Sequence, residues 1–427
     1  MEKKNFDYRT VGHIQFTVTI PEQTKIPSFA SCMANYLLHA LYSVFHRKTS
    51  YPQSNSMLFV TQSINNIRTL TPITRHLKNK EWGLISVYDF PITKVYRYSL
   101  PTWIQFLRFY RSNDQEGRMR IRHEFQNFVN APGFCKVYRK FLDANPIIKV
   151  LVVANDHTIP TRCLIETAYN MGVPVVYTQH ASITEQFPPL HFAYSFLDGA
   201  ESYEKYRAIG DMKGKAILLG SPRFDDVMPN RQQVSNTNRD AIGIGMNEMD
   251  ALDKVLHIAQ FIMSKTSRRV VVRPHPRSMA SFDSSYFTKH GIDISDSSKE
   301  SSFNFFTQIC MLVANESGIH LDAAIFGIPS VLYNFSDGKV LDWYGYLRKG
   351  LTTMAETPDD VISFIEKAGP VSDKVVQYYY AAFHTKYDGH IAETQAAFLD
   401  DFLEKGENTD YLDTLFQESE PNLYIIK

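Results

Sequence analysis

The stretch from Val270 to Pro329 constrains the fold more than any other part of this sequence. It opens with Val-Val-Val-Arg-Pro-His-Pro-Arg at residues 270–277, and a second apolar run follows at residues 312–314. Short Val-rich runs are typical of buried strands in parallel sheets. Each run stops abruptly at polar residues, and open α/β sheets bind ligands beyond the carboxyl ends of their strands. The stretch therefore predicts two strands that share one ligand-binding edge.

A helical pattern follows the second of these strands. Asn315, Glu316 and Ser317 precede it, and Ser317 is of the type that caps helix N-termini. Free backbone N–H groups and a partial positive charge at such an end stabilise phosphate. Gly327 and Pro329 end the helix, and a further strand begins at residue 330. We expect a phosphate or diphosphate pocket at this edge.

In the rest of the sequence, strand patterns alternate with helix patterns, which is typical of βαβ units. Strands are predicted at 14–20, 56–62, 84–88, 147–153, 175–178 and 241–245, with short strand ends at 197–200 and 216–225. Helices are predicted at 63–76, 160–170, 250–263, 359–368 and 392–403. A polar segment at 230–239 reads as a linker. The fold class is therefore α/β, with two Rossmann-like domains facing across a cleft.

The expected limits are 1–228 for an N-terminal acceptor domain, 240–390 for a C-terminal nucleotide-donor domain, and 391–427 for a terminal helix and acidic, solvated tail. A length of 427 residues suits two domains of roughly 200 residues each. The formal net charge is zero, which removes the global electrostatic case for binding nucleic acid. The four cysteines have no C-x-x-C spacing, which favours free thiols in a reducing compartment.

The N-terminal residues 1–10 are charged and polar and do not read as a signal peptide. The uncharged stretch Phe29–Phe45 contains Asn35 and His39, so a buried or interfacial helix is favoured over a membrane span. Residues 96–122 interleave aromatic side chains with arginines. They predict either an amphipathic helix with a solvated face or a face for an acidic acceptor or a membrane surface. A cytoplasmic protein is expected, with peripheral membrane contact left open.

The motif Arg273-Pro274-His275-Pro276-Arg277 follows its strand directly. Two prolines fix the backbone around the histidine, which can donate a hydrogen bond or titrate near neutrality. The flanking arginines can pair with phosphate oxygens. This motif predicts nucleotide binding by Arg273, His275 and Pro276.

Two further groups are candidate nucleotide ligands. Glu316, Ser317 and Gly318 open the helix described above, and Asp322 lies one turn into it, where a carboxylate can accept from ribose hydroxyls. Gly243 and Gly245 follow the start of a strand and resemble part of a phosphate-binding turn, although the full G-x-G-x-x-G is absent.

In the first half of the chain, two neighbouring strands end in titratable groups. Asp156 follows one and His180 follows the other, so either can act as general base toward a hydroxyl acceptor. Ser221 and Arg223 follow a third strand and are candidates for holding an acceptor or a phosphate. H-E-x-x-H, Walker A, paired CxxC and G-x-S-x-G motifs are absent from the sequence, and no metal ligands are assigned.

The order of these motifs resembles that of the GT-B glycosyltransferases of bacterial envelope polysaccharide synthesis. The resemblance is nearest to the CDP-glycerol glycerophosphotransferases and to the capsule transferases that use CMP-activated Kdo or sialic acid. The motifs that carry it are Gln179-His180, Gly220-Ser-Pro-Arg-Phe-Asp225, Arg273-Pro-His-Pro276, Glu316-Ser317 with Asp322 and Gly327-x-Pro329, and Tyr387-Asp-Gly-His390.

The resemblance implies that His275 and Ser317 contact the nucleotide phosphates, that Asp322 holds the ribose, and that His180 or Asp156 is the base. The glycerophosphotransferases show His-Gly where this chain has His180-Ala181, which favours Asp156. The implied activity is inverting, metal-independent sugar transfer from a nucleotide-activated donor, with CMP or CDP favoured, to a hydroxyl of a glycan or lipid-linked glycan of the capsule or O-antigen type. No cofactor is expected beyond this co-substrate. The alternatives are a CDP-glycerol-type polyol-phosphate transferase, a sugar-nucleotide 2-epimerase and a non-catalytic GT-B-like binding subunit.

Overall fold

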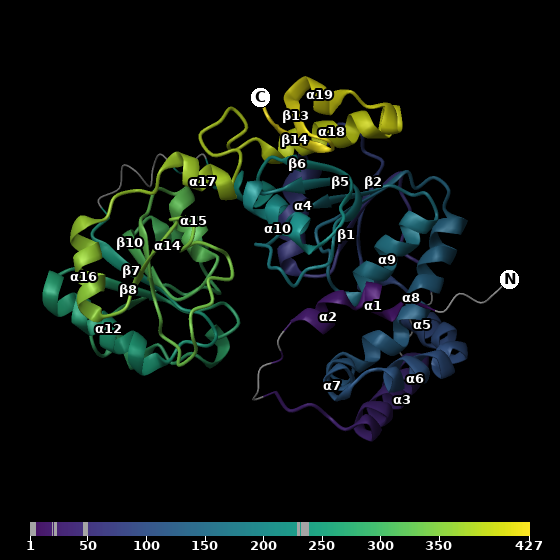
Figure 1. Cartoon of the computed structure of the whole chain (residues 1–427), viewed down its shortest axis with the longest axis horizontal. Coiled ribbons are helices and arrows are strands. Elements are labelled where there is room, and N and C mark those ends of the chain that lie inside the picture. The colour runs from purple at the N-terminus through teal and green to yellow at the C-terminus, as the bar shows by residue number, and fades with distance from the viewer. Residues whose placement is uncertain (1–5, 19, 21–23, 46–49, 229–230, 232–238) are drawn as a thin grey trace. The chain divides into compact units, whose positions relative to one another are not determined.

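A computed structural model describes residues 6–18, 20, 24–45, 50–228, 231 and 239–427 (Figure 1). Packing divides the chain into two compact units. Unit 1 comprises Met1–Arg223 together with His390–Lys427, and unit 2 comprises Phe224–Gly389. The expected domain limits stay a prediction, because this division follows packing and not independent folding. The expected α/β architecture of two Rossmann-like units is confirmed by the two sheets described below.

Unit 1 is built on an eight-stranded sheet in the order β13-β14-β6-β5-β4-β3-β1-β2. The strands are β1 (Met57–Thr61), β2 (Trp82–Ser86), β3 (Val150–Val153), β4 (Val175–Thr178), β5 (His191–Leu197), β6 (Lys213–Leu218), β13 (Phe416–Glu420) and β14 (Leu423–Ile426). All neighbours are parallel except β13 and β14. The strands β1, β3 and β4 are buried on both faces, as their near-continuous apolar sequences require.

The helices of unit 1 cover this sheet and extend beyond it. They are α1 (Tyr8–Val11), α2 (His13–Thr17), α3 (Phe29–Phe45), α4 (Ile64–His76), α5 (Ile92–Ser99), α6 (Trp103–Ser112), α7 (Gln115–His123), α8 (Phe125–Ala144), α9 (Ile159–Asn170), α10 (Ala200–Ile209), α18 (Ile391–Lys405) and α19 (Tyr411–Leu415). Ser63 begins α4 with a reciprocal capping box to Asn66, which satisfies two otherwise free N–H groups. None of the helices in the described part of the chain has both the length and the apolar composition that crossing a bilayer requires.

The prediction of a strand at residues 14–20 is wrong, because residues 14–17 belong to helix α2. Phe16 packs its ring against Phe109 and Phe128, with centroids 6.1 and 5.6 Å apart. Gly12, just before the helix, lies so close to the Phe128 ring that a Cβ there would meet it at 2.4 Å. Tertiary packing onto helices therefore overrides a short alternation of apolar residues.

The prediction that the acidic tail is solvated is also wrong. Its last residues form β13 and β14, and β14 pairs in parallel with β6, placing Leu423 opposite Ala216. Phe416, Leu423 and Tyr424 are buried, whereas the Gln417–Glu420 side of the edge strand is exposed. Exposed acidic residues on an edge strand discourage pairing with another chain. Figure 1 shows these yellow elements beside β6.

Unit 2 is built on a six-stranded, fully parallel sheet in the order β12-β11-β10-β7-β8-β9. The strands are β7 (Ala241–Gly245), β8 (Val270–Arg273), β9 (Asp293–Ile294), β10 (Ile309–Ala314), β11 (Ser330–Tyr333) and β12 (Thr353–Ala355). The helices are α12 (Leu252–Thr266), α13 (Ser285–Thr288), α14 (Ser302–Phe306), α15 (Ile319–Ile325), α16 (Pro358–Lys367) and α17 (Asp373–Tyr379). The predicted linker at 230–239 lies largely outside the described residues.

Counted along the sequence, the six strands of unit 2 have the spatial order 3-2-1-4-5-6. This order is characteristic of dinucleotide-binding Rossmann folds. The core beneath it joins Ile244 and Val272 of the sheet to Val255 and Ile262 of α12. Burial therefore fixes β7 and β8 in the first half of the sheet and β10 and β11 in the second half. The positions just beyond their carboxyl ends are free to carry polar residues.

Candidate functional site

The strand order of unit 1 reverses between β1 and β3, which are hydrogen-bonded neighbours. In open α/β sheets, ligands bind at such a switch point, beyond the carboxyl ends of the strands. Gln62 follows β1 there, and Asn155, Asp156 and His157 follow β3. Gln62 Oε1 accepts hydrogen bonds from Thr158 and from Thr161, the latter at 2.8 Å, which ties the two strand ends together.

Asp156 is fully buried at this switch point, with 1% of its side chain exposed. Its Oδ1 lies 2.9 Å from His157 Nδ1, and its Oδ2 accepts from the Tyr206 hydroxyl at 2.5 Å. Burial alone would raise the pKa of the Asp156 carboxyl, but hydrogen bonds from His157 and Tyr206 and the charges of His157 and His180 hold the pKa below its usual value. The carboxylate is therefore ionised at neutral pH, and each of its oxygens is bonded to one of these two partners, His157 and Tyr206.

Two histidine rings stack beside this carboxylate. The His157 and His180 centroids are 5.8 Å apart with an interplanar angle of 19°, and Phe187 packs on His157 at 4.7 Å. Burial and the neighbouring His157 lower the pKa of His180 to about 4, so that its imidazole is neutral at pH 7. Within the described residues, the buried Nδ1 of His180 has no hydrogen-bond partner. His157 is 22% exposed, and its Nδ1 is taken by Asp156, which makes Nε2 the nitrogen available for proton transfer.

The structure thus brings Asp156 and His180 together, as the sequence predicted, and adds His157 between them. His157 was not among the residues that the sequence predicted to be catalytic. The signal was its position directly after Asp156, but one sequence does not say which of two adjacent polar residues is buried.

Ser221 and Arg223 follow β6, on the same edge of the sheet. Ser221 is fully buried, and its Oγ has no hydrogen-bond partner within the described residues. The positive charge of Arg223 reaches His180 and contributes to the lowered pKa of that histidine. The acceptor or phosphate role of the two residues stays a prediction.

In unit 2, the strand order reverses between β7 and β10. Asn315 follows β10, and its amide donates to Asp250 Oδ1 at 2.8 Å across this switch point. Asp250 also accepts from the backbone N–H of Asn247 at 2.7 Å, in the loop that follows β7. Burial raises the pKa of Asp250 despite these bonds. Neither Asp250 nor Asn315 was among the residues predicted to bind the nucleotide.

His275 lies in the loop after β8, with 35% of its side chain exposed. Its Nδ1 is 3.2 Å from Glu248 Oε1, and the same carboxylate oxygen lies 3.5 Å from Arg277 Nη1. Burial lowers the pKa of His275, and Glu248 partly offsets this effect. His275 is thus partly exposed at the end of β8 and contacts Glu248. Nucleotide binding by Arg273, His275 and Pro276 stays a prediction.

Arg273 is directed elsewhere. It is 8% exposed, and its guanidinium donates to Ser295 Oγ at 2.8 Å and to the Glu300 carbonyl at 3.0 Å. It also lies over the Phe305 ring at 5.8 Å. These contacts fix the loops after β8 and β9, and they leave Arg277, which is 79% exposed, as the arginine of the motif that is open to solvent.

The helix after β10 starts one residue later than the sequence indicated. Gly318, and not Ser317, is the N-cap of α15, and no side chain caps it. Ser317 Oγ only accepts a long hydrogen bond from Ile319 N, at 3.4 Å. Glu316 accepts from the backbone N–H groups of Leu341 and Trp343, and burial raises the pKa of its carboxyl. The N-cap prediction for Ser317 is therefore wrong, whereas nucleotide binding by Glu316, Ser317, Gly318 and Asp322 stays a prediction.

The buried His320 lies beside the carboxyl end of β10 and contacts both β11 and the residue that follows β10. Its Nδ1 lies 2.9 Å from Ser330 Oγ and its Nε2 lies 3.1 Å from the Asn315 carbonyl. Burial lowers the pKa of His320 to about 4, so the ring is neutral and holds β10 and β11 in register at the edge. Sequence reasoning passed over this residue because an isolated histidine inside a helical pattern carries no signal.

Gly243 and Gly245 both lie within β7, so the expected turn is wrong. A Cβ on Gly243 would meet Ile309 Cδ1 at 2.5 Å and Phe305 Cζ at 2.6 Å, so this glycine is required for close packing inside the sheet layer. Gly245 ends the strand with looser surroundings, the nearest atom being Ile319 Cδ1 at 3.2 Å. Their nucleotide role stays a prediction. Among the described residues, no group of three His, Cys, Asp or Glu side chains is arranged to hold a metal ion.

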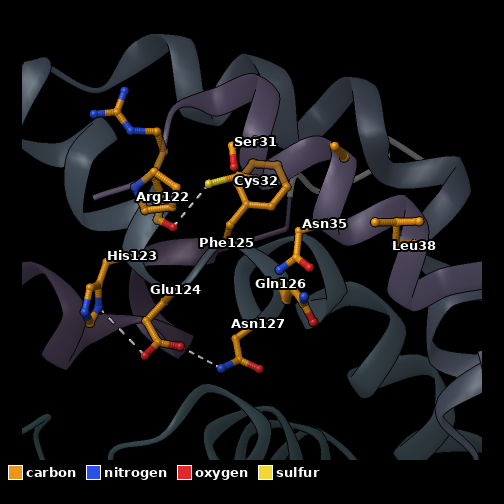
Figure 2. Close-up of a pocket in the computed structure, with 12 residues that line it drawn as sticks. Ser31, Cys32, Asn35, Leu38, Arg122, His123, Glu124, Phe125, Gln126 and Asn127 are labelled. Atoms are coloured by element: carbon orange, nitrogen blue, oxygen red, sulfur yellow. Dashed lines mark hydrogen bonds and ion pairs between the residues drawn. The ribbon is translucent and has the colours of Figure 1, made fainter. Parts of the chain in front are cut away.

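Two cavities occur away from both strand ends. One, of about 580 Å³, lies between α3 and the start of α8, and Figure 2 shows Asn35, Glu124, Gln126 and Asn127 around it. The other, of about 630 Å³, is lined by α18 and by the loops before β1 and β2, with Lys78, Lys149 and Asp400 among its residues. Neither contains a residue that the sequence predicted to be catalytic or nucleotide-binding.

No family model matches the sequence, and no curated protein matches it. Among solved structures, the chain is similar to the UDP-GlcNAc 2-epimerase of Neisseria meningitidis bound to UDP-GlcNAc, at 10% identity over 82% of this chain and 100% of that chain, with a TM-score of 0.48. It is similar to MnaA of S. aureus in complex with UDP, at 10% identity over 82% and 97%, with a TM-score of 0.47. It is similar to the wall teichoic acid polymerase TagF, at 10% identity over 88% and 98%, with a TM-score of 0.46. Likeness at this level does not identify a ligand.

Proposed function

We propose that this chain is a metal-independent, inverting glycosyltransferase that moves a sugar from a cytidine-activated donor to a hydroxyl of a cell-envelope glycan. The observation that carries the proposal is the buried Asp156 carboxylate bonded to the part-exposed His157 at the switch point of unit 1. A carboxylate that fixes one imidazole nitrogen leaves the other ready to take a proton, which is the arrangement of a general base with its orienting partner.

In this proposal, His157 Nε2 removes the proton of the acceptor hydroxyl. The acceptor oxygen then attacks the anomeric carbon from the side opposite the nucleotide, forming the new C–O bond as the bond to the leaving phosphate breaks. Asp156 stabilises the imidazolium that forms, and Tyr206 holds the carboxylate in place. His180, with its pKa lowered to about 4, stays neutral beside the positive ring and adds no repulsion at pH 7. This assignment moves the base from Asp156 and His180 to the histidine between them.

Donor binding belongs to unit 2. The strand order characteristic of dinucleotide-binding folds supports this, together with His275 and Arg277 after β8 and the Glu316–Gly318 segment after β10. His275 and Arg277 stabilise the charge that develops on the leaving phosphate. Asp322 accepts from the ribose, as the resemblance to GT-B glycosyltransferases implies. Envelope glycan as acceptor, with CMP-Kdo-like or CMP-sialic-acid-like donors, rests on the same resemblance.

A screen of thermal stability with CMP, CDP, UDP, GDP and ADP tests the donor assignment. A ligand that binds only the folded state at 100 times its Kd stabilises by about 2.7 kcal/mol. We expect CMP or CDP to raise the melting temperature most. A chain that none of the five nucleotides stabilises is not a nucleotide-dependent transferase. If the transferred group contains phosphorus, the activity is polyol-phosphate transfer and not sugar transfer. If the donor is converted to an epimer in the absence of an acceptor, the activity is epimerisation.

A further inference from the structure

Helix α3 presents its apolar side chains to solvent. Leu37 is 57% exposed, Leu38 65%, Leu41 58% and Phe45 75%. At roughly 100° per residue, these four side chains lie within about 100° of the helix circumference. Cys32, Tyr36 and Ser43, which are the buried residues of the helix, lie on the opposite side. An ordinary surface helix has the reverse arrangement, so this helix belongs against an apolar medium.

The same helix is held along the body of unit 1. The Tyr36 ring packs against Tyr96 at 5.1 Å and against Trp103 at 5.3 Å, and its hydroxyl donates to Asn130 at 3.1 Å. The Phe29 ring lies 4.8 Å from that of Tyr110. Contacts at both Phe29 and Tyr36 show that α3 runs antiparallel beside α6. A helix fixed along its length in this way would lie in the plane of a surface that it touches.

The elements that pack beside α3 are strongly basic. No charged residue occurs within α3, and Ile92–His123, which spans α5 to α7, contains seven Lys or Arg but only two Asp or Glu. Arg97, Arg108 and Arg111 are exposed there, and so are the apolar Leu100 and Ile104, at 60% and 68%. Because the whole chain has no net charge, this excess is local.

We propose that α3 and the basic α5–α6 segment form a docking surface for the face of an anionic phospholipid bilayer. Apolar side chains of an interfacial helix enter the boundary between headgroups and acyl chains, and nearby cations attract anionic lipid. Charge selects this occupant over a second copy of the chain, because two copies meeting through α3 would bring two basic segments together. Ser31, Asn35 and Leu38 line the polar cavity at the start of α8, so this cavity borders the apolar face of α3 at Leu38 (Figure 2).

Sedimentation of the full-length protein with sucrose-loaded vesicles tests this surface. Vesicles of phosphatidylcholine alone are compared with vesicles of phosphatidylcholine and phosphatidylglycerol at 7:3. We expect binding to the anionic vesicles that is at least about tenfold stronger than to the neutral ones, since each basic residue near the surface contributes about fivefold. The variant Leu38→Glu/Leu41→Glu/Phe45→Glu should lose about tenfold or more of this binding, and Arg97→Gln/Arg108→Gln should lose most of the preference for anionic lipid.

The matched control is Ile64→Glu/Leu84→Glu/Ile147→Glu, which adds the same charge at apolar residues that are 59%, 44% and 51% exposed elsewhere on unit 1. Thermal unfolding of each variant verifies the fold, and Leu38→Glu alone serves if the triple variant does not fold. The proposal is overturned by a wild-type protein that ignores anionic vesicles, by control and α3 variants that lose binding equally, or by light scattering that shows a dimer which the α3 variant alone dissociates.

Discussion

Nδ1 of His157 lies 2.9 Å from Oδ1 of Asp156, and the two residues are neighbours in the chain. The pair is therefore fixed by the backbone at the end of β3, where Asn155 Oδ1 accepts from the His157 N–H at 3.1 Å. A hydrogen bond to a charged group is worth about 1.5–3 kcal/mol, which suffices to hold one tautomer and one ring orientation. Changes to either residue should act on the same chemical step.

Replacing His157 by alanine should lower turnover by about 10²–10⁴-fold, the range for loss of a general base. Nucleotide affinity should stay unchanged, because the donor site is assigned to unit 2. Steady-state kinetics and calorimetric nucleotide titration measure the two effects separately. Asp156→Asn should also lower turnover and should alter its pH profile, since the imidazole loses its charged partner. A His157→Ala enzyme with wild-type turnover beside an inactive His180→Ala enzyme would return the base to His180.

His275→Ala should weaken nucleotide binding by about tenfold to a hundredfold, the equivalent of one charge-assisted hydrogen bond. The protein should remain folded, because the side chain is 35% exposed and its polar contacts are with the nearby Glu248 and Arg277. Nucleotide affinity and thermal unfolding are the two measurements. His290→Ala is the matched control, since this exposed histidine precedes β9 and so lies at the opposite edge of the sheet. Equal affinities in the two variants would remove His275 from the donor site.

The buried His320 should make stability depend on pH. Its pKa in the folded chain is about 4, against the ordinary histidine value of 6.5. The unfolded chain therefore binds a proton between these limits that the folded chain does not, so the stability present above pH 6.5 is lost as the pH falls toward 4. At 1.36 kcal/mol per unit, the loss reaches about 3 kcal/mol.

Urea unfolding of wild type and His320→Gln at pH 7 and pH 4.5 isolates this contribution, because His180 titrates in both proteins. The wild type should lose more stability over this interval than the variant does. Identical losses would mean that protonation of His320 is not linked to unfolding.

Phe416→Ala should destabilise the protein by about 3 kcal/mol, the cost of deleting a buried phenylalanine ring. This residue is 1% exposed where β13 pairs with the last strand of the chain. Gln417→Ala, at the next and exposed position, should change stability by no more than about 0.5 kcal/mol. Denaturant unfolding compares them. If Phe416→Ala left the free energy of unfolding unchanged, the tail would be solvated, as the sequence predicted.

Strong apolar runs allowed most of the fold to be predicted. Apolar runs at β1, β3, β4, β7, β8 and β10 are buried as expected. Helix α4 agrees within one residue with the helix predicted at 63–76. Short patterns of alternating apolar and polar residues were a poor guide, both where a strand was predicted and where none was predicted. Residues 14–20 alternate, but residues 13–17 form a helix. The acidic tail forms the strands β13 and β14, in which Phe416, Leu423 and Tyr424 are buried.

The site was predicted only at the level of strand ends. Their sequences indicate that polar residues gather at each edge, but not which of them turns inward. Arg273 turns toward Ser295 and Glu300, while His157 supplies the imidazole partner of Asp156. Such choices depend on partners that are distant in sequence, as Tyr206 is from Asp156, and a single sequence does not reveal them.

The pairing of β14 with β6 gives the chain an order of assembly. The ribosome synthesises all of unit 2, residues 224–389, before the last strands of unit 1. Helix α18 is equally late, and its Asp400 accepts from the backbone of Lys78 and Asn79 at 2.8 and 3.1 Å. The β6 edge of unit 1 therefore stays uncovered until the last residues of the chain have emerged. A nascent chain of this kind depends on chaperones or on rapid completion of synthesis to avoid aggregation at that edge.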